Sequence, residues 1–168
     1  MDVYEEFGVS KQETPFAIVP EKTIRKNLQG LKDYGFLEKQ IQKIVSVFPA
    51  TLSCSWERTL GILNNLEEYG FSSEQVIKIV CGFPTTLGCS WERTEKLLDI
   101  FQSIGFNVSN KPVRLMFSPD TLQSRINFLR IKFKIENTEL VKVVFRNNKQ
   151  FEKQFGISKE ELLRDYLN

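Results

Sequence analysis

Apolar residues recur along most of the chain at the spacing of amphipathic α-helices. The clearest case is residues 56–69, where three leucines on one predicted face are separated by other side chains: Leu60, Leu63 and Leu66. Ser55, before this segment, is a favourable N-cap, and Gly70, after it, can adopt the left-handed conformation that ends a helix. We therefore predict a helix over 56–69.

A second, shorter apolar pattern follows this glycine. Ser72 and Gln75 have the spacing of a capping box. The apolar residues after them are Val76, Ile77, Ile79 and Val80. This helix is predicted to end near Pro84, because proline disfavours helical geometry in the residue before it. The predicted unit is therefore a long helix, a glycine turn, a short helix and a proline-led loop.

The unit recurs at an offset of 35 residues. Residues 49–59 and 84–94 are identical at 9 of 11 positions. Three Gly-Phe pairs share the same offset and begin at Gly35, Gly70 and Gly105. A fixed period of this length is typical of stacked supersecondary units. The sequence therefore predicts an all-α tandem-repeat protein.

We expect a single repeat domain over 1–168, with an N-terminal extension or cap over 1–14. The predicted repeats cover 15–48, 49–83, 84–117 and 118–148, and a C-terminal cap covers 149–168. Ser118 follows the equivalent Ser90 by only 28 residues. We expect the seven missing residues to come chiefly from the proline-led loop. In the cap, Ser158 and Glu161 have capping-box spacing and are expected to begin a closing helix.

The residue content argues against catalysis. The chain contains no histidine, which excludes His-based nucleophile pairs and histidine zinc motifs, and it contains no glycine-rich phosphate loop. Its three cysteines show no Cys-x-x-Cys spacing, which indicates a reducing intracellular compartment rather than a disulfide framework. We therefore expect no enzymatic activity, no cofactor and no metal.

The same content argues against a membrane segment. The longest apolar runs fall well short of the roughly 18 residues that a membrane span requires. The first residues are acidic, whereas a signal or transit peptide is basic. As the chain stands we expect a cytoplasmic protein.

The repeat pattern resembles that of the mitochondrial transcription termination factor (mTERF) family. The resemblance rests on residues 70–87, 90–94 and 118–129, and extends over roughly 15–163. It implies a monomeric, curved, right-handed α-solenoid of about four helix triplets, in which the third helix is a short 3₁₀-like turn at Pro49 or Pro84. It also implies a basic concave face that binds duplex DNA or RNA in transcription regulation or termination. A processed or trimmed family member would be mitochondrial or plastid.

Charge is distributed unevenly along the chain. The net charge is +2, but residues 1–110 hold 11 basic and 14 acidic side chains, whereas residues 111–168 hold 12 and 7. This asymmetry indicates either a polyanion bound to the C-terminal half or simply an uneven solvated surface.

A series of cations occupies one position of the predicted short helices. Its members are Lys43, Lys78, Arg114 and Lys142. Cations repeated at the spacing of the units suit the regular phosphates of a duplex. The alternative is that an exposed helix position is often lysine and that duplicated repeats inherit it.

The densest positive region lies further along the chain and is our first choice for phosphate contact. This C-terminal basic cluster comprises Arg130, Lys132, Lys134, Arg146, Lys149 and Lys153. Arg125 on the last long helix is a further candidate. Arg58 and Arg93 occupy equivalent positions at the start of their helices, where they could instead form salt bridges between repeats.

Two pairs of equivalent residues favour packing over chemistry. Trp56 and Trp91 could stack on bases, but their duplicated setting suits contacts between repeats. Cys54 and Cys89 are predicted to be small buried fillers. Nucleic-acid binding is the preferred function. The alternative is a protein-interaction scaffold, because solenoid grooves bind peptides as readily as nucleic acids.

Overall fold

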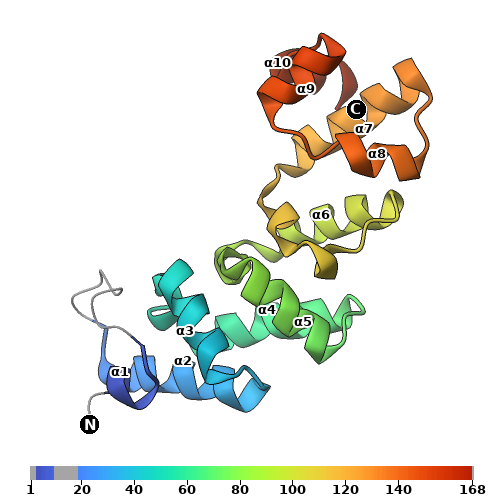
Figure 1. Cartoon of the computed structure of the whole chain (residues 1–168). Helices are drawn as coiled ribbons and strands as arrows, with labels where there is room; N and C mark the ends of the chain where they lie inside the picture. The colour runs from blue at the N-terminus through green and yellow to red at the C-terminus, as the bar shows by residue number, and fades with distance from the viewer. Residues whose placement is uncertain (1–2, 10–18, 168) are drawn as a thin grey trace. The chain divides into compact units, whose positions relative to one another are not determined.

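The computed structural model describes residues 3–9 and 19–167 (Figure 1). The regular elements in these two ranges are all helices, which confirms the predicted all-α class. None of the described helices is long and apolar enough to cross a membrane. The chain divides into two compact units, Met1–Trp91 and Glu92–Asn168. The predicted start of the array near residue 15 lies outside the described residues, and the predicted single domain stays a prediction.

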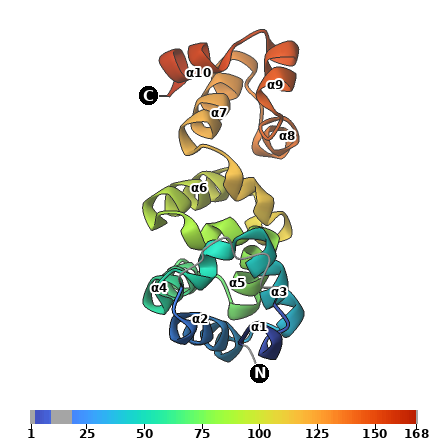
Figure 2. The ribbon, with the colours of Figure 1, turned by 90° about the vertical axis from the view of Figure 1, so that its left-hand side faces the viewer.

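The first unit alternates long and short helices after the short α1 (Val3–Glu6). Its first set is α2 (Glu21–Tyr34), α3 (Glu38–Val47) and the 3₁₀-helix η2 (Pro49–Leu52). Its second set is α4 (Trp56–Glu68), α5 (Ser73–Gly82) and the 3₁₀-helix η3 (Pro84–Gly88). Figure 2 shows the long helices α2 and α4 in one layer and the short helices α3 and α5 in another.

The helix ends follow the local chemistry of the sequence. Ser55 Oγ accepts a hydrogen bond from the Arg58 N–H at 3.3 Å, and Gly70 has a φ of 117° at the end of the long helix. The Ser72 N–H donates to Gln75 Oε1 at 2.9 Å, and the Gln75 N–H donates to Ser72 Oγ at 3.3 Å. The predicted N-cap, left-handed glycine and capping box are therefore confirmed.

The proline-led loops form 3₁₀-helices, as the family resemblance implied. Phe48 and Phe83 end the short helices in non-helical conformations, with ψ near 75° in both. This is the restriction that a following proline imposes. The loops pack against α2, α3 and α5. All four helices contribute fully buried aliphatic side chains, which include Leu28, Ile44, Leu63 and Ile79.

The second unit opens with α6 (Trp91–Ser103), whose first residue is the last of the first unit. Two 3₁₀-helices follow α6: η4 (Val108–Asn110) and η5 (Pro112–Met116). The remaining helices are α7 (Pro119–Phe133), α8 (Asn137–Val143), α9 (Asn148–Phe155) and α10 (Lys159–Tyr166). α10 packs along α7, and the Asn127 side chain donates to the Tyr166 carbonyl at 2.8 Å. The predicted closing helix and its Ser158–Glu161 capping box are confirmed.

The shortened repeat is missing its residues at a different place than predicted. Pro112 precedes the start of α7 at Pro119 by seven residues, just as Pro84 precedes the start of α6 at Trp91. The proline-led loop is therefore of full length. The short α-helix is what is missing, because only the three-residue η4 stands between α6 and η5. The prediction that the loop had shrunk is wrong.

Aromatic side chains fill much of the second core. Phe145 lies between Phe106 and Phe117, with ring centroids 4.8 and 5.5 Å away. Phe128 of α7 contacts Tyr166 of α10 at 5.1 Å between centroids. Edge-on and tilted pairs at these distances add to the energy of burial. The contacts of Phe128 with Phe151 and Tyr166 tie α9 and α10 to α7, whose exposed end carries the first half of the basic cluster.

Candidate nucleic-acid interface

Three of the four predicted series members occupy the same position of their helices. Lys43, Lys78 and Lys142 are each the sixth residue of α3, α5 and α8, and all three are exposed. Lys43 and Lys78 belong to neighbouring short helices of the first unit. Lys142 pairs with Glu139 at 2.5 Å. Because both side chains are exposed, this pair contributes less than about 1 kcal/mol, and a phosphate could replace the carboxylate.

Arg114 does not belong to this series. It lies on η5, two residues after Pro112, at the position that Thr86 occupies after Pro84. Its Nη1 donates to the Phe145 carbonyl at 3.4 Å, and its guanidinium lies 4.9 Å from the centre of the Phe145 ring. The prediction for Arg114 assumed a short helix that this part of the chain lacks. Its half-buried side chain binds the protein itself.

Arg125 is likewise removed from the candidate surface. The residue is 1% exposed. Its Nη1 donates to the carbonyls of Val144 and Arg146 at 2.8 and 2.5 Å, and its Nη2 donates to Asn148 Oδ1 at 2.7 Å. Burial lowers the pKa of the Arg125 guanidinium to about 10, so it remains charged at neutral pH. The prediction that Arg125 contacts phosphate is wrong, because its donors are already used inside the core.

Arg58 and Arg93 also donate to loop carbonyls. Arg58 Nη2 reaches the carbonyl of Gly88 at 3.3 Å, and Arg93 Nη2 reaches those of Leu115 and Phe117, both at 2.9 Å. Each arginine thereby ties the start of its long helix to the loop that closes the same set. Salt bridges between repeats were the predicted alternative for these two arginines. The structure shows such a salt bridge between Lys26 of α2 and Glu57 of α4.

The C-terminal basic cluster lies at two places in the second unit. Arg130, Lys132 and Lys134 end α7. The other three members precede or belong to α9: Arg146, Lys149 and Lys153. All six are exposed. Arg130 Nη2 donates to Asn137 Oδ1 at 3.0 Å. Lys134 has a left-handed φ of 51° as the C-cap of α7, which turns the chain sharply before α8.

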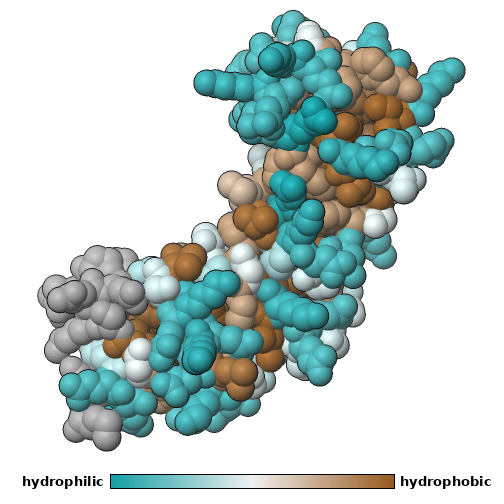
Figure 3. All heavy atoms as spheres, in the orientation of Figure 1, coloured by the Kyte–Doolittle hydropathy of each residue, from teal (hydrophilic) through white to brown (hydrophobic). Residues whose placement is uncertain are grey.

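A hollow of about 390 Å³ lies along the polar face of α9. It is lined by Arg146, Gln150, Lys153 and Gln154. Gln150, Lys153 and Gln154 share one side of α9, and Arg146, which precedes the N-cap of this helix, joins them at the hollow. Figure 3 shows hydrophilic side chains over this end of the chain. Such a surface combines charge for phosphate oxygens with amide donors for sugar or base edges.

Sequence reasoning missed some of the residues at this surface. Gln150 and Gln154 could have been found because Gln150 lies three residues before Lys153 and four before Gln154, which places all three on one face of a helix. Lys159 could not, because it lies on the next helix and is brought beside Ser118 and Thr121 only by the packing of α10 on α7.

The equivalent tryptophans pack against the protein. A Cβ atom on Gly30 would lie 2.5 Å from the Trp56 ring, so the indole sits directly on that glycine of α2. Trp91 contacts Tyr69 with ring centroids 6.4 Å apart. Cys54 and Cys89 are half-buried rather than fully buried. The described residues include no cluster of three or more acidic or cysteine side chains that could hold a metal ion.

The comparisons with known proteins decide the family. A sequence model of the mTERF family matches residues 2–104, more than half of the chain. The chain belongs to the mTERF family. A search of curated proteins found no match. The mTERF match covers the first unit and α6, so the cations on α7, α8 and α9 lie beyond the matched residues.

Proposed function

We propose that this mTERF-family chain is a non-enzymatic nucleic-acid-binding repeat protein with a role in transcription regulation or termination. It contacts the phosphate backbone of duplex DNA or RNA through exposed lysines and arginines. The observation that carries the proposal is the C-terminal basic cluster, whose six side chains are all exposed in the second unit. Family membership supports the same class of ligand.

Burial decides which cations belong to the proposed interface. Arg114 and Arg125 are excluded because carbonyls and aromatic rings already bind them. The remaining nine are Lys43, Lys78, Arg130, Lys132, Lys134, Lys142, Arg146, Lys149 and Lys153. If four to six of them neutralise phosphates at once, the logarithm of the affinity should fall against the logarithm of salt concentration with a slope of roughly −4 to −5 on duplex DNA.

The arrangement of the units is part of the proposal. We infer a curved, right-handed solenoid of about four sets of helices, with the basic residues on its concave face. Lys43 and Lys78 on adjacent short helices support such a regular spacing within the first unit. A monomer in a mitochondrion or plastid fits the family.

The test is a binding titration with labelled duplex DNA, single-stranded DNA and RNA at two salt concentrations. The informative variant carries Lys142→Glu, Arg146→Glu and Lys149→Glu. Its matched control carries Lys22→Glu, Lys32→Glu and Lys39→Glu, three exposed lysines of the first unit outside the proposed interface. Both variants change the net charge by the same amount, so a difference between them reports position rather than total charge.

The first variant should bind at least about tenfold more weakly than the control. Its salt slope should be shallower by about 3, because roughly one unit of slope disappears for each phosphate that is no longer neutralised. The proposal fails if the natural chain binds none of the nucleic acids at low salt. It also fails if the triple variant at Lys142, Arg146 and Lys149 binds nucleic acid as tightly as the natural chain.

A protein-interaction scaffold is the second candidate, and one observation favours it. Ile131 and Phe133 alternate with Arg130, Lys132 and Lys134 at the end of α7 and are 65% and 50% exposed. Large apolar side chains at such exposure are typical of contact surfaces. If the chain binds nucleic acid through its cations, replacing Ile131 and Phe133 with serine should leave nucleic-acid affinity unchanged. If the same variant loses only the binding of a protein partner, the result favours the scaffold.

A further inference from the structure

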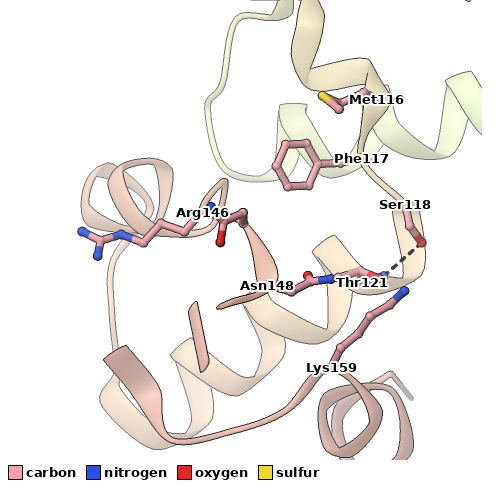
Figure 4. Close-up of a pocket in the computed structure, with 8 residues that line it drawn as sticks. Met116, Phe117, Ser118, Thr121, Arg146, Asn148 and Lys159 are labelled. Atoms are coloured by element: carbon pink, nitrogen blue, oxygen red, sulfur yellow. Dashed lines mark hydrogen bonds between the residues drawn. The ribbon is translucent and has the colours of Figure 1, made fainter. Parts of the chain in front are cut away.

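A hollow of about 290 Å³ lies at the N-terminus of α7 in the second unit (Figure 4). Ser118, Thr121, Asn148 and Lys159 are among the residues that line it. The Lys159 side chain reaches from the start of α10 toward Ser118 and Thr121, whereas the Arg146 guanidinium points away from both. Lys159 therefore supplies the cationic group of the hollow.

The backbone at this point favours an anion. α7 is 15 residues long, and its first N–H groups lie at the positive end of the helix dipole. Pro119 has no N–H, so Asp120 and Thr121 offer the first two. The Thr121 N–H makes only a long contact of 3.4 Å with Ser118 Oγ. The Asp120 carboxylate opposes a bound anion, but it is exposed and therefore screened by water.

One of the residues that line the same hollow, Thr121, carries a buried hydroxyl. Thr121 is 5% exposed, and its Oγ1 has no hydrogen-bond partner among the described residues. An unpaired buried hydroxyl costs about 1–3 kcal/mol, so native proteins usually provide a partner. A ligand oxygen in the hollow would provide one after a small rotation of the side chain.

Comparison between sets of helices explains why this space is open. Thr121 is the third residue after the serine N-cap of its long helix, the position that Arg58 and Arg93 occupy after theirs. Those arginines extend to loop carbonyls. Threonine is too short to do so, and Arg125, one turn further along α7, binds the loop carbonyls instead.

Arg125 also positions a donor for the hollow. Its Nη2 donates to Asn148 Oδ1 at 2.7 Å, so the Asn148 amide oxygen faces the guanidinium. The amide Nδ2 of Asn148 is therefore directed away from Arg125, and Asn148 lines the hollow. The hollow thus combines an ammonium, a hydroxyl, an amide and the N-terminus of a helix.

We propose that this hollow binds a phosphate group. The chemistry is shared by a strand phosphate of nucleic acid, which rests on the proposed function, and by a free phosphate anion, which does not. Lys159 supplies the charge, and the backbone N–H groups of Asp120 and Thr121 donate to the phosphate oxygens. The Thr121 hydroxyl and the Asn148 amide complete its hydrogen bonds.

The first arm of the test uses inorganic phosphate alone. It is titrated into the isotopically labelled full chain at constant ionic strength, while amide resonances are recorded by NMR. The Asp120 and Thr121 amides should shift saturably. Lys159→Gln should weaken phosphate binding roughly fivefold to tenfold, and Thr121→Val should weaken it while preserving the fold. Lys111→Gln, an exposed lysine of the same unit that does not line the hollow, is the matched control and should bind normally.

The proposal is overturned if saturating phosphate leaves these two amides unmoved. It is equally overturned if Lys159→Gln and the control bind phosphate alike while circular dichroism shows both to be folded. Lys159 is exposed and Val is close to Thr in shape, so neither variant depends on rebuilding the core.

The second arm uses the oligonucleotides of the proposed function. If a strand phosphate occupies the hollow, Lys159→Gln should lower their affinity and make the salt slope shallower by about 1. If inorganic phosphate binds but Lys159→Gln leaves oligonucleotide affinity unchanged, the phosphate site is supported and its ligand is a free phosphate. If the natural chain binds phosphate but no nucleic acid, the proposed function fails and the phosphate site survives.

Discussion

Replacing Arg125 with methionine should destabilise the second unit strongly. Methionine keeps an unbranched stem but removes the guanidinium and its hydrogen bonds to Val144, Arg146 and Asn148. It also removes the packing of the guanidinium on the Phe151 ring, 4.4 Å from its centroid. The carbonyls of Val144 and Arg146 would then lose this donor.

The magnitude follows from two opposing effects. Hydrogen bonds from a charged donor contribute about 1.5–3 kcal/mol each, and the substitution removes three of them. Removing a buried cation also relieves the free energy spent on its desolvation, so the net destabilisation is smaller than the sum. We expect unfolding free energy to fall by about 2–4 kcal/mol. The unfolding free energy of Arg125→Lys should lie between those of the natural chain and Arg125→Met, because a single ammonium cannot reach three acceptors.

Urea unfolding measures this destabilisation. Far-UV circular dichroism follows both units, whereas Trp56 and Trp91, the two tryptophans of the chain, both belong to the first unit. With a urea dependence of about 2 kcal/mol per molar, the midpoint for the second unit should fall by roughly 1–2 M. The control is Arg58→Met, which removes one exposed hydrogen bond of 3.3 Å and should cost less than about 1 kcal/mol. A cost below about 0.5 kcal/mol for Arg125→Met would refute the reasoning.

Two further predictions concern the first unit. Gly30→Ala should lower unfolding free energy by about 1–3 kcal/mol, because its Cβ would lie 2.5 Å from the Trp56 ring, and urea unfolding followed by tryptophan fluorescence measures this. Gly61→Ala, inside α4, would place a Cβ with no described atom within 4 Å apart from its chain neighbours and the backbone of its own helix, and should instead stabilise by up to about 1 kcal/mol. Equal effects of the two substitutions would contradict the packing argument. Burial, and then the hydrogen bond to Glu67, raise the pKa of the Tyr34 hydroxyl above its ordinary value of 10.0. The folded state therefore keeps the hydroxyl proton at a pH where the unfolded state loses it, so unfolding free energy should fall as pH rises beyond about 10. Tyr34→Phe should remove that part of the alkaline destabilisation in urea titrations at increasing pH, and an unchanged pH profile would argue against it.

Local chemistry determined most of the helices. The leucine spacing, Ser55, Gly70 and the Ser72–Gln75 pair predicted α4 and α5 to within one residue at most ends, and the 35-residue offset carried this pattern to α2 and α3. These features act within one turn of helix, so they are visible in the sequence. The family could be inferred for the same reason, since its repeat is a local pattern.

The location of the seven missing residues depended on longer-range relations. The sequence shows that the third set is short, but both the loop and the short helix could have been reduced. The proline-led loop keeps its full length, and its carbonyls at Leu115 and Phe117 accept hydrogen bonds from the Arg93 guanidinium. Because the short helix is the part that is missing, Arg114 lies on η5 and does not belong to the predicted series of cations.

The sequence by itself determined that the chain is helical, repetitive and richest in cations near its C-terminal end. Only the tertiary structure separated Arg125, buried and bound to carbonyls, from lysines such as Lys149 that face water. The reason is that arginine and lysine occur at similar positions of a helical pattern. Whether such a side chain is buried depends on the hydrogen-bond acceptors that other segments of the fold supply. The same packing brought Lys159 to the N-terminus of α7, a pairing of residues about 40 positions apart that no local pattern encodes.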